Sequence, residues 1–418
     1  MLDQSAEMEF VVQLSAALIQ AGTAVDDVHK TAVAAAEHMG IRDASMVVLP
    51  TVVLLQAGGD TSNPNLMTSF RRLGMRLDQI TALDELTRLA ERGDVTAADG
   101  LRRLRDIRRS RPPRRRIVRV IGMGVLSTGF ALLLQPTPAG IGLAFVLGIF
   151  VGILRIIELP RFQVVLPVIA TFCVSLAVFW FAGHYDAENP IRMLIPPLVL
   201  FLPGAALTTG TMELAAGDTV SGASRLVEGV VNLLLLAFGI VAAAQVVHVS
   251  QAELIDNPIE SLGWLTPLVG LVVLTAGHYL HNCAPRRTVG WIFLVCSVAF
   301  AGQAAGAAVV APELSAFFGA IVMTPLILWL SGRPDGPPRM TLFLPAFWML
   351  VPGASGLIGV TQAVGTSGVA AGDFGETAVT VASITLGTLL GAATWNASTD
   401  VAAYALNLVG RSSDIDDG

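Results

Sequence analysis

Long apolar segments fill the chain after residue 116, and they are the feature that most limits its fold. About ten of them approach the roughly 20 residues that a helix needs to cross the hydrocarbon core of a bilayer. The composition agrees, because 53% of the 418 residues are hydrophobic and only 14% are charged. The sequence predicts a mostly α-helical polytopic membrane protein with spans near 117–135, 140–157, 163–182, 191–212, 226–248, 263–282, 289–310, 314–330, 342–363 and 377–408.

The first 110 residues have a different character and are expected to form a small soluble α+β domain. Thr23 and Thr96 stand where they would cap helices, and the Val- and Leu-rich run 46–56 predicts a strand interrupted at Pro50. No basic region precedes an apolar run at the N-terminus, so we expect no signal peptide and a cytoplasmic domain. The spacing of apolar residues predicts four helices, at 7–20, 24–39, 78–91 and 96–109.

Ten arginines lie between Arg102 and Arg119. The segment lacks the interleaved aromatic residues of a nucleic-acid surface, whereas basic residues beside a first span are typical of a cytoplasmic membrane anchor. We therefore expect a basic juxtamembrane linker at 111–119, then a first five-helix membrane repeat at 117–250 and a second at 263–410.

The short loops predict the orientation of the spans, because arginine accumulates on the cytoplasmic side. With a cytoplasmic N-terminal domain, Arg192 alone falls at an outer end, and the outer loops carry acidic residues such as Asp186, Glu253 and Asp373. The arginines at inner ends are Arg155, Arg161, Arg225, Arg286, Arg287, Arg333, Arg339 and Arg411.

Two similar motifs occupy the fourth and ninth segments. LFLPGA ends at Ala205 and MLVPGA ends at Ala354, and each is followed by AAGD, which ends at Asp218 and at Asp373. Because each half holds five spans, a second copy enters the membrane from the opposite side, which predicts an inverted repeat. Chance similarity in a chain rich in Gly and Ala is the alternative.

A Pro-Gly pair inside a span removes a backbone donor and breaks the helix, and such breaks in both halves indicate a substrate site. Ordinary proline kinks, with hydroxyls bonded to their own helices, are the competing interpretation. The residues expected to bind substrate are Pro203, Gly204, Thr208, Thr209, Asn232, Pro352, Gly353, Ser355, Gln362 and Asn396.

Ionisable side chains within spans are costly and mark proton pathways. Arg225 and Glu228 also lie three residues apart on one helix face, so helix capping and ion pairing remain an alternative role for this cluster. The residues expected to couple protons or to gate transport are Glu213, Asp218, Arg225, Glu228 and Asp400.

Other chemistries find little support. Cys173, Cys283 and Cys296 form no metal or disulfide pattern, and His278 and His281 lack further ligands, so neither a metal nor a cofactor is expected. A membrane aspartyl enzyme is the rival class, but the orientation puts Asp218 and Asp373 on opposite sides of the bilayer. No nucleotide-binding motif occurs. A passive channel remains an alternative to a coupled transporter.

The stretch LPGAALTTGTMELAAGDTVSGASRLVEG, from Leu202 to Gly229, resembles the threonine/serine exporter family. QAGTAVDDVH from Gln20 and VPGASGL from Val351 are similar to the same family's N-terminal and second membrane regions, in the form that carries both membrane halves on one chain. The resemblance implies a plasma-membrane exporter of L-threonine and L-serine driven by the proton motive force, and an exporter of a small dicarboxylate such as succinate is the alternative. The expected partners are the amino acid, protons and the lipid bilayer. No nucleic-acid partner is expected, and a homo-oligomer is one possible assembly.

Overall fold

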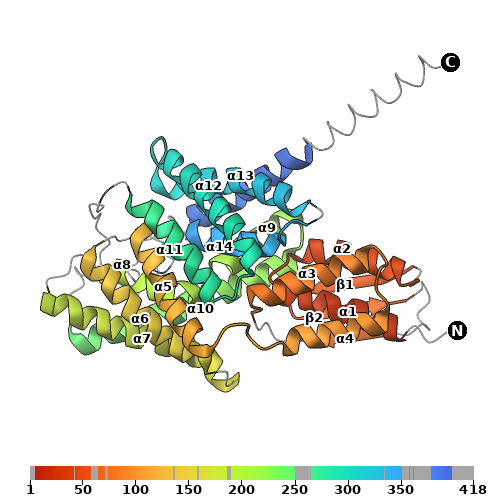
Figure 1. Ribbon diagram of the computed structural model, residues 1–418, viewed down its shortest axis with the longest axis horizontal. Coiled ribbons are helices and arrows are strands. Elements are labelled where there is room, and N and C mark those ends of the chain that lie inside the picture. Colours follow the sequence, from red (N-terminus) through yellow and green to blue (C-terminus); the bar gives the residue numbers. More distant parts are fainter. Residues whose placement is uncertain are drawn as a thin grey trace, which may run out of the picture.

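The protein consists of an N-terminal α+β unit beside a larger body of apolar helices (Figure 1). The structure, a computed structural model, describes residues 5–41, 43–57, 65–70, 74–134, 137–157, 160–185, 190–249, 263, 265–333, 335–350, 357, 361 and 378–397. The statements below concern these residues.

The N-terminal unit, here called the N-domain, packs four helices against a small sheet. The helices are α1 (Ser5–Gln20), α2 (Val25–His38), α3 (Leu77–Glu91) and α4 (Ala97–Arg109), which confirms the four that the sequence predicts. The antiparallel sheet has the order β1-β2-β3, with β1 (Ser45–Leu49), β2 (Val52–Gln56) and β3 (Asn65–Ser69). The predicted strand at 46–56 is therefore a hairpin.

Pro50 lies in the turn of that hairpin. Leu49 pairs with Val52, so Pro50 and Thr51 form the turn, where the missing proline N–H costs no ladder hydrogen bond. Strand β3 was not anticipated, because a five-residue segment with the sequence NLMTS carries little apolar signal.

One of the two predicted helix caps is confirmed. The Thr96 hydroxyl accepts a hydrogen bond from the Asp99 amide at 3.4 Å, as expected at the start of α4. The prediction for Thr23 was wrong, because α2 begins one residue later, with Ala24 as its N-cap. Helix α1 ends at Gln20, and Gly22 follows it with φ +97°, a conformation that suits glycine. This turn places Thr23 in the connection between the helices.

Among the described residues, the helical body has seven helices that are long and apolar enough to span a membrane, and an eighth span if one bent pair is counted as one. Helices α11 and α14 are shorter, so the predicted spans 263–282 and 342–363 are matched only in part and ten spans remain a prediction. The helices are α5 (Arg116–Leu134), α6 (Pro138–Ile156), α7 (Pro160–Tyr185), α8 (Pro190–Leu198), α9 (Gly204–Ala216), α10 (Thr219–Val247), α11 (Thr266–Leu280), α12 (Val289–Ala307), α13 (Pro312–Ser331), α14 (Arg339–Leu350) and Ala378–Ala397, with the 3₁₀ turns η1 (Val199–Phe201) and η3 (Arg286–Thr288).

Helices α5 and α11, which begin the two predicted membrane repeats, cross in close contact. A Cβ on Gly129 would lie 2.5 Å from the Leu274 amide nitrogen, and a Cβ on Gly277 would lie 2.4 Å from the Leu126 Cα atom. Gly122 approaches Leu280 at the other end, so the two helices run antiparallel. An inverted repeat requires this arrangement, although the repeat itself stays a prediction.

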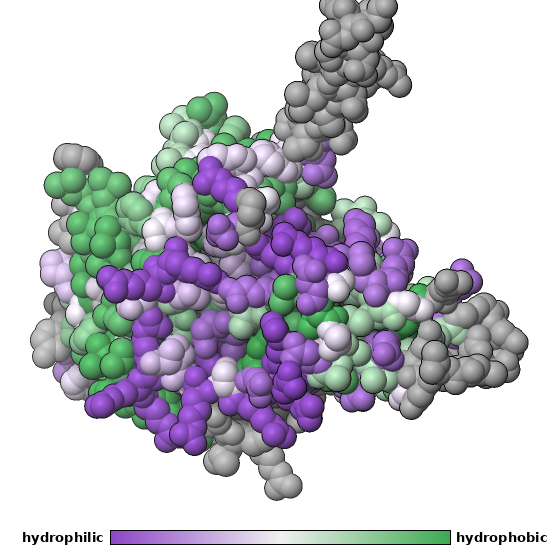
Figure 2. All heavy atoms as spheres, turned by 45° about the vertical axis from the view of Figure 1, so that its right-hand side comes forward, coloured by the Kyte–Doolittle hydropathy of each residue, from purple (hydrophilic) through white to green (hydrophobic). Residues whose placement is uncertain are grey.

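The outer surface of the helical body is apolar. Val146, Phe238 and Val272 are 61%, 63% and 57% exposed, and Trp180 is half exposed. Figure 2 shows hydrophobic residues gathered over the helical body and hydrophilic ones over the N-domain side. An exposed apolar surface on this scale fits lipid rather than water.

Candidate functional site

The fourth membrane segment is broken as the sequence predicts. Helix α8 with η1 and helix α9 meet at an angle of 65°, separated by Leu202 and Pro203. A broken helix leaves carbonyls without helical partners, and here the Asn232 side-chain amide on α10 donates to the Phe201 carbonyl at 2.8 Å. Asn232, expected to bind substrate, therefore stabilises the break.

Only one of the threonines after the break offers a buried, available hydroxyl. Thr208 is fully buried, and its Oγ1 has no hydrogen-bond partner among the described residues. Thr211 donates to the Leu207 carbonyl of its own helix at 2.8 Å, which is the ordinary behaviour of a helical threonine. Thr209 is half-buried.

Helices α9 and α10 form a tight hairpin whose turn lies at Gly217, where φ is +97°. A Cβ on Gly222 would lie 2.5 Å from the Gly210 carbonyl oxygen, and a Cβ on Gly229 would lie 2.5 Å from the Leu207 side chain. These close approaches fix the register of the hairpin. Glu213 and Arg225 consequently face each other across it.

Glu213 and Arg225 form a buried ion pair. The Arg225 Nε donates to Glu213 Oε2 at 2.8 Å, and the two side chains are 4% and 1% exposed, respectively. The connection between α1 and α2 completes the cluster: Val25 N donates to Glu213 Oε1 at 3.1 Å, and Arg225 Nη2 donates to the Thr23 carbonyl at 3.2 Å. We call these four residues the latch, since they join the N-domain to the α9–α10 hairpin.

Sequence reasoning selected Glu213 and Arg225 but missed Thr23 and Val25 as their partners. The latter two take part through backbone atoms, and they lie 202 and 188 residues from the side chains that they contact. No side-chain pattern carries such a signal.

Further contacts tie the N-domain to the connections on the same side of the helical body. Leu77 N donates to the Asn282 carbonyl at 3.1 Å, and Arg88 Nη2 donates to the Gly336 carbonyl at 3.2 Å. Arg287 pairs with Glu85 across the same boundary. The N-domain therefore touches the α9–α10, α11–α12 and α13–α14 connections together.

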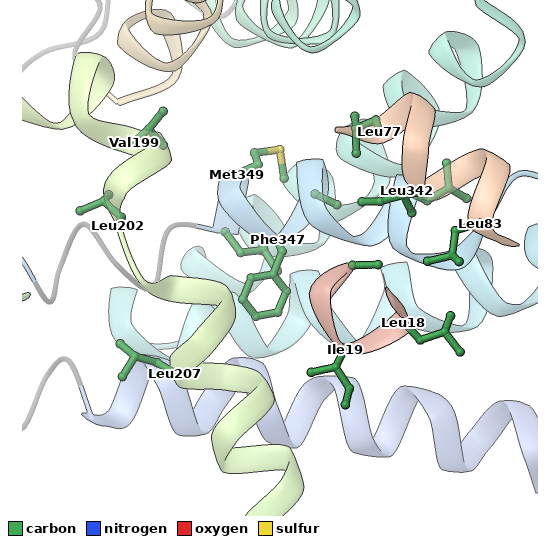
Figure 3. Packing of buried hydrophobic residues seen from close by; sticks show 14 of the residues in the cluster. Leu18, Ile19, Leu77, Leu83, Val199, Leu202, Leu207, Leu342, Phe347 and Met349 are labelled. Atoms are coloured by element: carbon green, nitrogen blue, oxygen red, sulfur yellow. The ribbon is translucent and has the colours of Figure 1, made fainter. Parts of the chain in front are cut away.

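An apolar cluster continues this boundary toward the broken helix. Figure 3 shows Phe347 and Met349 of α14 among residues of the first break, with Leu207 below and Val199 and Leu202 to one side. The C-terminal end of helix α1 approaches from the other side with Ile19, and helix α3 approaches there with Leu83. The broken fourth segment and helix α14, which lies in the predicted ninth segment, thus meet beside the N-domain.

The remaining sequence candidates lie in varied places. Asp218 is the half-buried N-cap of α10, and its side chain makes no capping bond. Glu228 and Asn396 are exposed, the former on α10 and the latter on helix Ala378–Ala397. Outside the described residues lie Pro352, Gly353, Ser355, Gln362 and Asp400.

The two histidines considered as metal ligands have structural partners. The His278 ring stacks on Trp348 with centroids 5.5 Å apart, and its Nδ1 lies 2.8 Å from the Asn282 side-chain nitrogen. His281 Nδ1 lies 2.9 Å from the Arg119 carbonyl. Within the described ranges, no group of three or more His, Cys, Asp or Glu residues is placed to hold a metal ion.

The fold and the site define a class: a polytopic helical membrane protein with a broken helix buried beneath an attached N-domain. Residues 9–247, more than half of the chain, match the family model described as "Putative threonine/serine exporter". The chain belongs to the threonine/serine exporter family, whose members are transporters. The match runs from α1 to the end of α10, so it covers the N-domain and helices α5 to α10.

One curated relative is an uncharacterized protein of Schizosaccharomyces pombe, strain 972, which is 29% identical over 180 residues. That alignment covers 39% of this chain and 21% of the relative, so the chain spans about a fifth of the relative's length. No solved structure matches this chain.

Proposed function

We propose that the protein is a secondary active exporter of the small polar amino acids L-threonine and L-serine, driven by the proton motive force across the plasma membrane. Membership of the family supports the transport class. The choice of substrate rests on the site at the break, and the coupling rests on the latch.

The observation that carries the proposal is the unpartnered hydroxyl of Thr208, one turn into helix α9. The first amides of a helix lack internal acceptors and attract anions, and α9 starts at Gly204 directly after the break. A substrate carboxylate fits these amides, and the Thr208 hydroxyl can then bond to the carboxylate or to the substrate's own hydroxyl. Pro352, Gly353, Ser355 and Gln362 would complete the site from the second half, with Thr209 and Asn396 as further candidates.

Coupling is proposed to run through Glu213. A proton on this carboxylate removes the charge that pairs with Arg225, and a buried charge without its partner is costly. Protonation therefore weakens the hold of the N-domain on the α9–α10 hairpin. Asp218, Glu228 and Asp400 are the alternative proton carriers.

The proposed orientation places the N-domain in the cytoplasm. All three connections that the N-domain touches are inner connections in the topology set by the arginines, so contacts and charge agree. The N-domain then covers the inner side of the broken helix.

Transport by the purified protein in proteoliposomes tests the site. With an imposed pH gradient, we expect uptake of labelled L-threonine by the wild type, a loss of at least tenfold in Thr208→Val, and near-normal uptake in Thr211→Val. Both variants replace one hydroxyl of α9 with a methyl group of similar size. Thr211 donates its hydroxyl to its own helix, whereas the Thr208 hydroxyl has no hydrogen-bond partner among the described residues. Equal loss in both variants would contradict the site, and uptake of succinate without threonine or serine would contradict the substrate.

The same vesicles test the coupling. We expect Glu213→Gln to uncouple threonine flux from the pH gradient, because glutamine keeps an acceptor for Val25 but cannot take up a proton. The flux is normalised to the amount of monodisperse protein. Unchanged proton dependence in this variant would move the coupling role to Asp218, Glu228 or Asp400.

A further inference from the structure

A cavity of about 310 Å³ lies between the N-domain and the helical body. Helices α2 and α3 supply most of its lining, and Ser331, Pro338, Arg339 and Met340 supply the side formed by the α13–α14 connection. No residue of α8, α9 or α10 lines it. Thr23 of the latch lines the cavity but the broken helix does not, so the cavity is separate from the substrate site proposed at the break.

The charged residues around the cavity are balanced. Three are acidic and three are basic, namely Asp27, Asp84, Glu91, Lys30, Arg88 and Arg339. Three carboxylates disfavour a polyphosphate, and three cations disfavour a divalent metal ion. The volume lies at the lower end of the range of about 300–1,000 Å³ for ligand pockets, which indicates a small ligand of mixed charge.

Several of these charges already have partners. Arg88 binds Asp84 at 2.9 Å and the Gly336 carbonyl at 3.2 Å, and Lys30 binds Asp26 at 2.5 Å. Burial raises the pKa of Asp84, while the charges of Arg88, Glu91 and Arg339 also act on it. Glu91 and Arg339 line the same cavity as this carboxyl group.

Glu91 and Arg339 can exchange their present partners for a ligand. Glu91 accepts a hydrogen bond from the neutral Thr31 hydroxyl at 2.9 Å, and the described residues give it no cationic partner. Arg339 Nη1 forms an ion pair with Asp27 Oδ2 at 3.7 Å, which is longer than a hydrogen bond, and the two side chains are 52% and 46% exposed, so a ligand carboxylate can replace Asp27. The buried hydroxyl oxygen of Ser331, on the same wall as Arg339, has no hydrogen-bond partner among the described residues.

We propose that this cavity binds a small zwitterion, an α-amino acid, with its ammonium on Glu91 and its carboxylate on Arg339. The Ser331 hydroxyl supplies a further polar contact. The balanced charges and the small volume of the cavity indicate the zwitterion, and the choice of L-threonine and L-serine rests on the proposed function. The ligand bridges α3 of the N-domain to the start of α14, so its binding strengthens the attachment of the N-domain.

Equilibrium binding of radiolabelled L-threonine to the full chain in nanodiscs tests the proposal. The Thr208→Val background removes the proposed transport site, and we expect saturable binding to persist there. Adding Glu91→Gln or Arg339→Gln should weaken this binding about tenfold or more, because each removes a charge-assisted hydrogen bond. Glu37→Gln, an exposed carboxylate of α2 outside the cavity, should change it less than twofold.

Two analogues sharpen the result. 3-Hydroxybutyrate lacks the ammonium and 1-amino-2-propanol lacks the carboxylate, so neither should compete with labelled threonine. Loss of all threonine binding in Thr208→Val, or binding there that ignores both Glu91→Gln and Arg339→Gln, overturns the proposal. Binding that needs Glu91 and Arg339 in a wild type that transports no amino acid would instead refute the proposed function and leave this site standing.

Hydrogen exchange separates ligand binding from misfolding of the variants. In the wild type, L-threonine or L-serine should slow amide exchange in α2, α3 and residues 335–340. Glu91→Gln should show the wild-type exchange pattern without ligand and no slowing with it. Absence of slowing in the wild type with either amino acid also overturns the proposal.

Discussion

At the scale of single residues, the latch combines a strong attraction with a large desolvation cost. Glu213 and Arg225 are almost wholly buried, so each needs the other, and the backbone groups of Thr23 and Val25 satisfy further atoms of the pair. Such pairs contribute less to net stability than their geometry suggests, but removing one partner is severe.

We predict that Arg225→Met lowers the free energy of unfolding by about 3–5 kcal/mol, because it leaves the Glu213 carboxylate buried without its cation. The double variant Glu213→Gln/Arg225→Met should recover much of that loss. Thermal unfolding of the detergent-solubilised protein, arranged as a double-mutant cycle, measures the coupling. Arg102→Met serves as control, since Arg102 is 68% exposed in its pair with Asp99, and it should cost less than about 1 kcal/mol.

Asp84 gives a prediction about pH. Burial raises its pKa above the ordinary 3.8 in the folded protein, so the folded state holds this proton more tightly than the unfolded state does. Its contribution to stability is therefore most favourable below pH 3.8 and falls as the pH rises through the folded-state pKa. The melting temperature of the wild type minus that of Asp84→Asn should decrease from pH 3.5 to neutrality.

Glu37→Gln, which alters an exposed carboxylate of α2, provides the control curve for a change in net charge. A difference curve for Asp84→Asn that rises with pH would show that the attraction of Arg88 outweighs burial.

At the scale of elements, glycine decides where helices approach. Gly210, Gly222 and Gly229 let α9 lie directly against α10, and Gly129 and Gly277 do the same for α5 and α11. Helix association within a bilayer depends on such close packing, because lipid supplies little hydrophobic driving force.

We expect Gly222→Ala to destabilise the protein by about 1–3 kcal/mol, because its Cβ would meet the Gly210 carbonyl oxygen and the Leu214 amide, which are backbone atoms that cannot turn aside. Gly142→Ala on α6 is the matched control, since a Cβ there meets nothing within 4 Å. Fluorescence-detected size exclusion after heating reports both. Equal melting temperatures for the two variants would show that the hairpin adjusts freely.

Some of these elements and contacts could be predicted from the sequence, and others could not. Periodicity predicted α1 to α4, and Pro203-Gly204 predicted the break, because these features depend on local chemistry. The pairing of Glu213 with Arg225 was missed, since it depends on the turn at Gly217 and on the contact with the N-domain. Thr208 was one of several hydroxyl candidates, and only the packing distinguishes it from Thr211.

At the scale of the whole molecule, the N-domain is attached to connections that belong to both of the predicted membrane repeats. The latch holds the first half, while Asn282, Gly336 and Arg339 hold the second. Any rearrangement of one half against the other must therefore alter at least one of these contacts.

The orientation is open to a direct test. Val309, between α12 and α13, is 82% exposed and lies at an outer end in the proposed topology, whereas Glu37 lies on the N-domain. A membrane-impermeant maleimide should label Val309→Cys in intact cells and Glu37→Cys only after lysis. The wild type, whose three cysteines are buried or half-buried, gives the background, and the reverse pattern would refute a cytoplasmic N-domain.

The latch has a consequence for natural variation. The N-domain side of the contact consists of the Thr23 carbonyl and the Val25 amide, which almost every amino acid possesses. Exchange of these side chains during evolution leaves the hydrogen bonds intact, whereas proline at position 25 removes the donor and a bulky residue at Gly22 strains the turn that presents both atoms. Homologues can therefore preserve this attachment with different side chains at positions 23 and 25.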